Sequence, residues 1–228
     1  MPILSVRGVS KSFARGLARS APRSLALAQI DLDVSRGEVI GLFGPEASGK
    51  TTLLQCIAGL LRPDAGDIEL HGLPINMGRR GRVIAYAPAV PVFYPFLTPR
   101  DVISFECARL TRQASSSEID NLLGIVELSH RSHFPVRELS RDEIKQVAVA
   151  ESLCGHPDVL LIDTMATERV DERVIARVAA RGPAVIIAVR DCSHIASVAT
   201  RLIHLDGGRV ERSFTPEPQL MFVAERLH

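Results

Sequence analysis

The sequence lacks an excess of charge of either sign. Its 228 residues include 27 lysines and arginines against 26 aspartates and glutamates, which leaves a formal net charge of +1. Binding to a polyelectrolyte or to an anionic membrane surface usually requires a clear basic surplus. We therefore expect no nucleic-acid partner, and we expect any other partner to be recognised by local features.

Cysteines are few, and long apolar runs are absent. No run approaches the roughly 18 apolar residues that span a bilayer, and residues 1–7 lack the basic and apolar pattern of an export signal. We expect a chain that neither crosses a membrane nor is exported. The widely spaced cysteines predict reduced, mostly buried thiols in a reducing compartment rather than disulfides or a zinc site: Cys56, Cys107, Cys154 and Cys192.

The sequence contains enough apolar residues for a core, at 46% of the chain. It has no internal repeat. This length fits one large domain, or one domain with a helical insertion. Alternation of apolar and polar residues in 3–9 and 28–34 predicts two strands of an antiparallel ribbon, joined by an exposed, arginine-rich loop over 14–24.

A phosphate-binding motif follows the next strand. Residues 38–43 form a short apolar run, residues 44–51 read G-P-E-A-S-G-K-T, and residues 50–61 have helical spacing. This order of strand, glycine loop and helix is the context that the motif G-x-x-x-x-G-K-[ST] requires. The predicted ATP contacts are Gly44, Pro45, Glu46, Ala47, Ser48, Gly49, Lys50, Thr51 and Thr52.

Each residue type that this motif specifies has a physical role. Gly44 and Gly49 allow backbone N–H groups to point at the β-phosphate, beside the positive end of a helix. Lys50 reaches the β- and γ-phosphate oxygens, and Thr51 holds Mg²⁺.

The remaining elements follow from periodicity and turn residues. Further strands are predicted at 68–70, 82–87, 159–162 and 184–188, with turns at 64–67 and 71–74 and an edge hairpin of 201–205 with 209–210. Helices are predicted at 100–112, 118–126, 141–153, which Ser140 caps, and 172–181.

Asp163 ends the buried strand at 159–162. Ligands collect at the carboxyl ends of strands in open α/β sheets, so we expect this carboxylate to join Thr51 at Mg²⁺. The alternative is an aspartate that caps a helix.

Together these residues resemble the ATPase subunits of ABC transporters, collinearly over nearly the whole chain. Phe13 matches the aromatic that stacks on adenine, although such a residue alone is more often core. The other matching segments are 86–88 with 96–98, 138–140 with 147–150, 156–158 before Asp163, and 206–210.

The resemblance implies an α/β fold: a P-loop NTPase with a RecA-like core, an N-terminal antiparallel β ribbon and a helical subdomain insertion. The whole of 1–228 would form a single ABC-type ATP-binding domain. Its core would comprise 1–88 and 155–213, its helical subdomain 89–154, and its C-terminal tail 214–228, where 220–227 forms either a terminal helix or a dimer contact.

The chain departs from the family where hydrolysis is performed. Ala89 stands in place of the glutamine that contacts Mg²⁺ and the attacking water. The signature Leu-Ser-Gly-Gly-Gln reads 139–143 as L-S-R-D-E. Only Ser140 remains to contact a nucleotide bound by the opposite subunit, and Asp142 and Glu143 would repel phosphate.

Two further catalytic positions are replaced. Thr164 stands in place of the catalytic glutamate, and its hydroxyl is not basic at neutral pH. Arg190 stands in place of the switch histidine, where it either clamps the γ-phosphate or pairs with Asp191. The family's next loop aspartate aligns with Val170, and Asp171 lies one residue late.

The resemblance therefore implies a degenerate ATP-binding subunit of an ABC transporter that holds Mg-ATP but hydrolyses it weakly or not at all. We expect a second, more competent ATPase subunit as partner, a heterodimer rather than a homodimer. We expect integral membrane permease subunits to contact residues 89–98, about half of whose apolar side chains belong to the core. The subunit would lie in the cytoplasm, peripheral on the inner face of the membrane.

Two other functions stay open at this point. One is an active transport ATPase in which Arg190 and a carboxylate, that of Glu168, Asp171 or Glu172, replace the missing groups. The other is a P-loop protein without a membrane partner.

Overall fold

The computed structural model describes residues 1–14, 23–75, 84–110, 114–164 and 171–216. Parts of several predicted elements lie outside these residues: most of the loop at 14–24, the strand residues Arg82 and Val83, the helix end at 111–112, and the tail at 220–227. Glu168 and Val170 also lie outside them.

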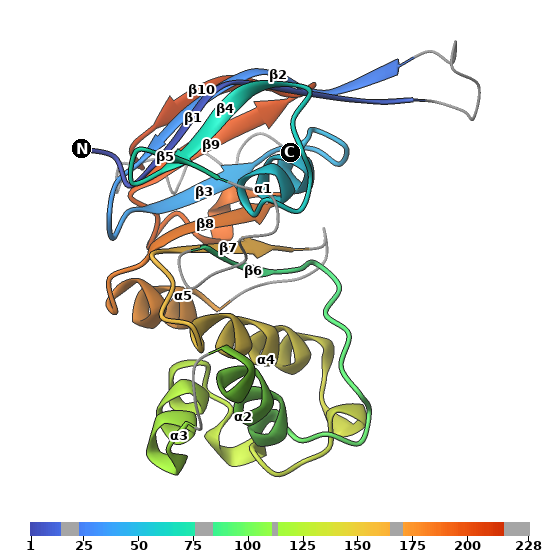
Figure 1. The fold of residues 1–228 in the computed structure, drawn as a ribbon. Helices are drawn as coiled ribbons and strands as arrows, with labels where there is room; N and C mark the ends of the chain where they lie inside the picture. Colours follow the sequence, from blue (N-terminus) through green and yellow to red (C-terminus); the bar gives the residue numbers. More distant parts are fainter. Residues whose placement is uncertain (15–22, 76–83, 111–113, 165–170, 217–228) are drawn as a thin grey trace.

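A six-stranded sheet forms the centre of the molecule, in the order β10-β9-β3-β8-β7-β6 (Figure 1). All neighbours are parallel except β10, which pairs antiparallel with β9. The strands are β3 (Val39–Phe43), β6 (Ile84–Ala87), β7 (Val159–Asp163), β8 (Ala184–Val189), β9 (Arg201–Asp206) and β10 (Arg209–Phe214). Strands β7 and β8 are buried along their whole length, which explains their continuous apolar sequence.

A second sheet of four strands, in the order β2-β1-β4-β5, contains the predicted ribbon. Its strands are β1 (Leu4–Ala14), β2 (Arg23–Val34), β4 (Ala65–Leu70) and β5 (Leu73–Pro74). The ends of β1 and β2 project beyond the rest of the molecule (Figure 1). The prediction of one turn over 71–74 is wrong in part: only His71 and Gly72, with φ of 52° and 72°, form the turn, and Leu73 pairs with Leu70.

The helix after the phosphate-binding motif, α1 (Lys50–Ile57), is shorter than predicted. Gly59, with φ of 66°, leaves the helical conformation. Its N–H donates to Cys56 O at 3.1 Å, and the N–H of Leu60 donates to Gln55 O at 2.9 Å. This pair of bonds is the Schellman arrangement that ends a helix. The helix therefore ends here, although apolar residues continue at helical spacing up to Leu61.

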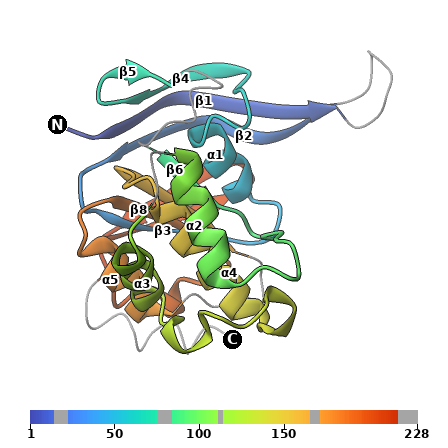
Figure 2. The same ribbon diagram turned by 60° about the horizontal axis from the view of Figure 1, so that its bottom comes forward.

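Three helices form the inserted helical region: α2 (Pro99–Leu110), α3 (Ser116–Ile125) and α4 (Arg141–Leu153). They lie together at one end of the molecule, away from the ribbon (Figures 1 and 2). Ser140 caps α4 in a complete capping box, as predicted. Ser115 caps α3, which therefore begins two residues before the prediction. Among the described residues, no helix is long and apolar enough to cross a bilayer.

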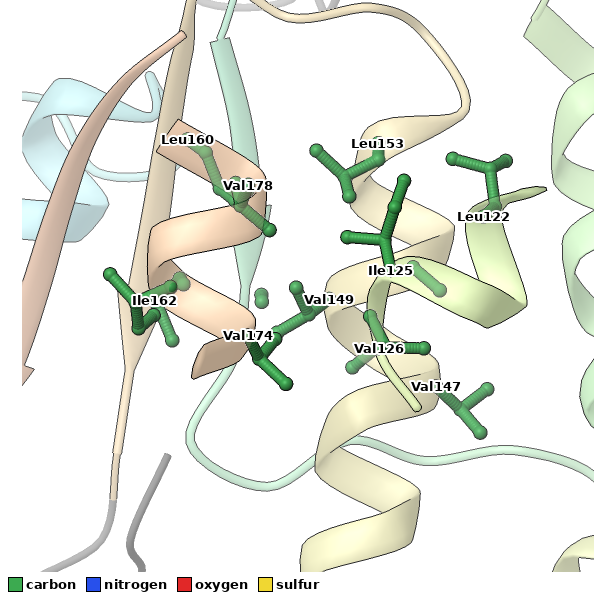
Figure 3. Packing of buried hydrophobic residues seen from close by; sticks show 14 of the residues in the cluster. Leu122, Ile125, Val126, Val147, Val149, Leu153, Leu160, Ile162, Val174 and Val178 are labelled. Carbon is green, nitrogen blue, oxygen red and sulfur yellow. The ribbon is translucent and has the colours of Figure 1, made fainter. Parts of the chain in front are cut away.

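Alternate residues of the central strands supply two separate cores. One face of the sheet packs with α1 and the ribbon sheet. The other face packs with α5 (Glu172–Ala179) and the helical region, as Figure 3 shows for Leu160, Val174 and Val149. The four cysteines are free, and three of them are buried, as predicted for mostly buried thiols. The architecture confirms the predicted fold class, and the central sheet directs the carboxyl ends of β3 and β7 to one edge.

Candidate nucleotide-binding site

The phosphate-binding motif folds as a tight loop between β3 and α1. Gly44 and Gly49 have φ of 149° and 105°, a region that side chains rarely adopt. A Cβ atom on Gly44 would lie 2.0 Å from the carbonyl oxygen of Leu205, and one on Gly49 would lie 2.4 Å from that of Ala26. Glycine is therefore required at both positions by conformation and by space.

Lys50 lies across this loop. Its ammonium group donates to Gly44 O at 2.8 Å, Pro45 O at 2.7 Å and Ser48 Oγ at 3.0 Å. Partial burial lowers the pKa of Lys50, and the negative charges of Asp163 and Glu46 oppose that shift. The ammonium is held where the phosphates of a nucleotide would meet the loop N–H groups.

The hairpin of β9 and β10 is hydrogen-bonded to the loop. The N–H of Gly208, in the turn between β9 and β10, donates to Ser48 O at 3.0 Å. The carbonyl of Gly208 accepts from the N–H of Ala28 in β2 at 2.8 Å. The loop is thereby fixed to both sheets.

A cavity of about 610 Å³ opens over the loop, within the size range of ligand pockets. It brings together segments far apart in the sequence: the ribbon, the loop, Ala89 and the ends of β7 and β8. The lining residues are Phe13, Ser24, Leu25, Ala26, Gly44, Glu46, Ala47, Ser48, Gly49, Lys50, Thr51, Thr52, Ala89, Thr164 and Arg190.

Phe13 stands on the ribbon side of this cavity and is 43% exposed, so it does not belong to the core. The ammonium of Lys11 lies 5.7 Å from its ring centroid. Lys11 also donates to Asp64 at 3.0 Å, and Asp64 accepts from the N–H of Ser12 at 2.9 Å. These bonds lower the pKa of Asp64 and fix the strand that carries the ring.

Asp163 lies beneath the cavity with 1% of its surface exposed. One carboxylate oxygen accepts from Thr51 Oγ1 and the other accepts from the hydroxyl of Tyr86, both at 3.1 Å. The backbone carbonyl of Asp163 accepts from the ammonium of Lys145, which is also buried. The carboxylate is therefore held by side chains from α1 and β6, and the backbone carbonyl by a side chain from α4.

Tyr86 and Lys145 are site residues that the sequence reasoning missed. Tyr86 is the last residue but one of β6, which pairs with β7 in parallel, and a polar residue near that strand end was an available signal. Burial and the neighbouring Asp163 raise the pKa of Tyr86. Lys145 gave no comparable signal, because it lies in the middle of a helix.

The oxygen atoms of Thr51 and Asp163 fit a magnesium ion. Mg²⁺ prefers oxygen ligands and usually binds through one or two protein groups together with phosphates and water. The two side chains already lie within hydrogen-bonding distance, on the helix and strand that face the loop. Ala89 adds no ligand atom to this set.

Thr164 and Arg190 both line the cavity. The hydroxyl of Thr164 donates to Ala188 O in β8 at 2.7 Å. Arg190 is exposed, and its charge contributes to the lowered pKa of Lys50. Asp191 instead accepts from the N–H of Ser193 at 2.9 Å, at the start of a short 3₁₀ helix.

Ser140 lies away from this cavity, at the start of α4. Its hydroxyl accepts from the N–H of Glu143 at 3.2 Å, and the Glu143 carboxylate accepts from the N–H of Ser140 at 2.7 Å. Arg131 forms an ion pair with Glu143 at 3.1 Å. Arg131 therefore compensates part of the charge of Glu143, whereas Asp142 forms no such ion pair among the described residues.

The carboxylates considered as replacements for the catalytic glutamate are engaged elsewhere where the structure describes them. Asp171 caps α5 and accepts from the N–H of Arg173 at 2.8 Å. Glu172 accepts from the hydroxyl of Ser197.

The segment at 89–98 runs from β6 to α2 and divides into two kinds of side chain. Phe93 and Leu97 pack against the core. The other four apolar side chains are 63–87% exposed: Val90, Val92, Tyr94 and Phe96. The rings of Tyr94 and Phe96 stack with centroids 5.6 Å apart. Two of the six side chains, rather than half, thus belong to the core.

Comparison with known proteins gives consistent matches. The family model described as ABC transporter matches residues 27–167. The chain is 32% identical to the hemin import ATP-binding protein HmuV of Nocardia farcinica over 241 residues, which cover 96% of this chain and 83% of that protein. It is 31% identical to the glutamine transport ATP-binding protein GlnQ of Escherichia coli over 206 residues, which cover 84% and 85% of the two chains.

Solved structures share the fold over almost the full length. The structure of cbiO1 from Clostridium perfringens, part of the ABC transporter complex cbiONQ, has a TM-score of 0.79 at 26% identity, with 99% of this chain and 92% of that chain covered. A dimeric ATP-binding cassette bound to ADP and Pi has a TM-score of 0.78 at 21% identity, with coverages of 94% and 99%.

Proposed function

The chain belongs to the ABC transporter family as an ATP-binding subunit, and from this membership we propose that it retains Mg-ATP binding while hydrolysing ATP weakly or not at all. The observation that supports the proposal most strongly is the contrast between two parts of one cavity. Lys50 is hydrogen-bonded to the loop, and Thr51 is hydrogen-bonded to Asp163. Thr164 and Ala89 offer no group that could take a proton from water.

The nucleotide would be bound by groups of this chain alone. Loop N–H groups and Lys50 would meet the β- and γ-phosphates, Phe13 would stack on the base, and Thr51 with Asp163 would hold Mg²⁺. When bound, Mg²⁺ would neutralise part of the phosphate charge. Positioning and charge stabilisation are available, whereas Thr164 and Ala89 supply no general base, and such a base typically contributes about 10²-fold or more to the rate.

Among the described residues that line the cavity, Arg190 is the cation besides Lys50. Its guanidinium can fork onto phosphate oxygens and, unlike histidine, it is always charged. We assign it to the γ-phosphate side of the site because it lines the cavity with Lys50. Such a contact would favour retention of ATP and would not activate water.

The replaced positions fall on both functional faces of the chain. Thr164 and Ala89 belong to the phosphate-loop side, and Arg141 with Asp142 belong to the signature that would meet the nucleotide of an opposite subunit through Ser140. A homodimer would therefore contain two impaired sites. We propose a structural or regulatory role beside a second, more competent ATPase subunit.

We further propose that permease subunits contact the segment at 89–98, where four apolar side chains face solvent. Contiguous exposed apolar side chains of this kind commonly mark protein interaction sites. The subunit would then lie peripherally on the cytoplasmic face of the membrane. The single domain of 1–228 would divide into a core of 1–88 and 155–213, a helical subdomain of 89–154 and a tail of 214–228.

The competing proposals differ in a measurable rate. We expect steady-state ATP turnover by the purified chain to equal that of Lys50→Ala, because both lack an effective base. A turnover that Lys50→Ala abolishes would support an active transport ATPase instead. A chain that co-purifies with no integral membrane protein would support a P-loop protein outside transport.

A further inference from the structure

Lys145 is a buried cation that links two parts of the molecule. Its side chain is on α4, in the helical region, and the residue is 2% exposed. Its ammonium donates to two backbone carbonyls of the core, those of Asp163 and Pro88. A buried ammonium is costly unless it is well hydrogen-bonded, so these bonds determine where α4 can lie.

The two carbonyls belong to segments with different proposed roles. Asp163 ends β7, and its carboxylate holds Thr51 at the proposed Mg²⁺ position. Pro88 is the second residue after Tyr86 and begins the segment whose exposed side chains we assign to the permease. One nitrogen atom therefore joins the nucleotide side of the core, the signature helix and the start of the permease segment.

At the first position of the segment at 89–98, the side chain itself offers no such connection. Ala89, which lines the cavity, ends in a methyl group and can form no hydrogen bond through its side chain. Besides the backbone and the packing of Phe93 and Leu97 on the core, Lys145 offers a side-chain route for a signal between Mg-ATP and residues 89–98.

We propose that Lys145 is the positioning residue through which Mg-ATP at Asp163 alters the segment at 89–98. This inference rests on the proposed binding of Mg-ATP. A shift at the end of β7 moves the Asp163 carbonyl, the Lys145 ammonium follows, and Pro88 and the start of α4 follow the ammonium. The lysine stem is enclosed by protein, so it transmits such a shift instead of absorbing it.

Hydrogen exchange of the whole chain, with and without Mg-ATP, tests the proposal. The reporters are the amides of 90–98 other than those of the prolines: Val90, Val92, Phe93, Tyr94, Phe96, Leu97 and Thr98. In the unmodified chain we expect Mg-ATP to slow their exchange. Lys145→Met keeps the length of the stem but removes the donor, and we expect it to reduce that effect about fivefold or more, in line with usual coupling free energies.

A purely structural role gives a different pattern. If Lys145 only supports the fold, Lys145→Met speeds exchange equally with and without Mg-ATP. Ser152→Ala is the matched control, because it removes a hydrogen bond to Ala148 O within the same helix, and it should leave the nucleotide effect intact. If Lys145→Met does not fold, Lys145→Gln, which keeps an N–H donor at shorter reach, should still show a reduced effect.

The possible failures are distinguishable. If the unmodified chain binds no Mg-ATP, the proposed function fails. If it binds Mg-ATP but exchange at 90–98 does not change, or if Lys145→Met responds as fully as the unmodified chain, the role of Lys145 is overturned and the proposed function stands.

Discussion

Single side chains divide the cavity into a binding side and a side without catalytic groups. Lys50 bonds to three oxygens of its own loop, and Thr51 bonds to Asp163. Thr164 lies in the same cavity, but its hydroxyl is committed to the carbonyl of Ala188. Binding and hydrolysis should therefore respond to different substitutions.

Calorimetric titration with Mg-ATP measures the first of these responses. We expect Lys50→Ala to weaken ATP affinity at least about tenfold, since charged hydrogen bonds contribute about 1.5–3 kcal/mol each. Thr164→Ala is the matched control in the same cavity and should leave affinity within about twofold. Equal losses in the two variants would contradict the assignment of Lys50 to the phosphates.

Site residues whose roles depend on neighbours in the sequence could be predicted, and those whose roles depend on tertiary contacts could not. The loop from Gly44 to Thr51 was predictable because motif, preceding strand and following helix are contiguous. The cap at Ser140 was predictable for the same reason. The contacts of Tyr86 and Lys145 with Asp163 join residues 77 and 18 positions apart, and only the packed structure brings them together.

At the level of elements, helix ends depend on backbone conformation more than on apolar spacing. Gly59 ends α1 at φ of 66°, whereas Gly124 lies inside α3 without such a φ. Spacing alone predicted a longer α1. It also could not separate the partly buried Phe93 and Leu97 from their exposed neighbours in an irregular segment.

Urea denaturation of two glycine variants should show opposite signs. We expect Gly59→Ala to lower the free energy of unfolding by about 1–2 kcal/mol, because alanine is strained in the left-handed region. Gly124→Ala should raise it by up to about 1 kcal/mol, because alanine favours a helix interior and the nearest atom to its Cβ is 3.8 Å away. A loss of stability in both variants would refute this account of the α1 end.

The packing of α2 against α4 contains a titratable carboxyl. Burial, together with the nearby carboxylate of Glu106, raises the pKa of Glu151 from 4.5 to about 7, and Arg109 opposes the shift. A raised folded-state pKa stabilises the protonated form, so this contribution is complete below pH 4.5 and is lost as pH rises through about 7.

Glu151→Gln, which stays neutral at every pH, isolates this effect. We expect the variant to be more stable than the unmodified chain at pH 8, with the difference shrinking as pH falls toward 4.5. Unfolding free energies measured at pH 5 and pH 8 check this. A difference that does not change between the two pH values would contradict the assignment to Glu151.

At the scale of the whole molecule, two sheets and a helical region hold both the nucleotide-binding cavity and the proposed contact surface at 89–98. The ribbon carries Phe13, the central sheet carries Asp163, and the segment after β6 presents its apolar side chains to solvent. The fold class followed from the sequence because the resemblance extends over nearly the whole chain. The exposed apolar side chains of 89–98 are the feature that we propose to contact another protein.

Association with membrane partners tests that surface. We expect the double substitution Tyr94→Ala and Phe96→Ala to leave the free energy of unfolding within about 0.5 kcal/mol, as is usual for exposed side chains, while reducing co-purification with permease subunits. Leu73→Ala is the control, because Leu73 is 69% exposed on β5 in the other sheet. Equal recovery of membrane partners by both variants would rule out this contact.

The central claim, that this subunit holds ATP without cleaving it, is tested most directly by a single-turnover measurement. Labelled ATP is incubated with Mg²⁺ and an excess of the purified chain, and bound nucleotide is identified after long incubation. We predict that the label stays bound and is recovered as ATP, and that Lys50→Ala loses the bound label. Recovery of bound ADP from the unmodified chain would contradict the account.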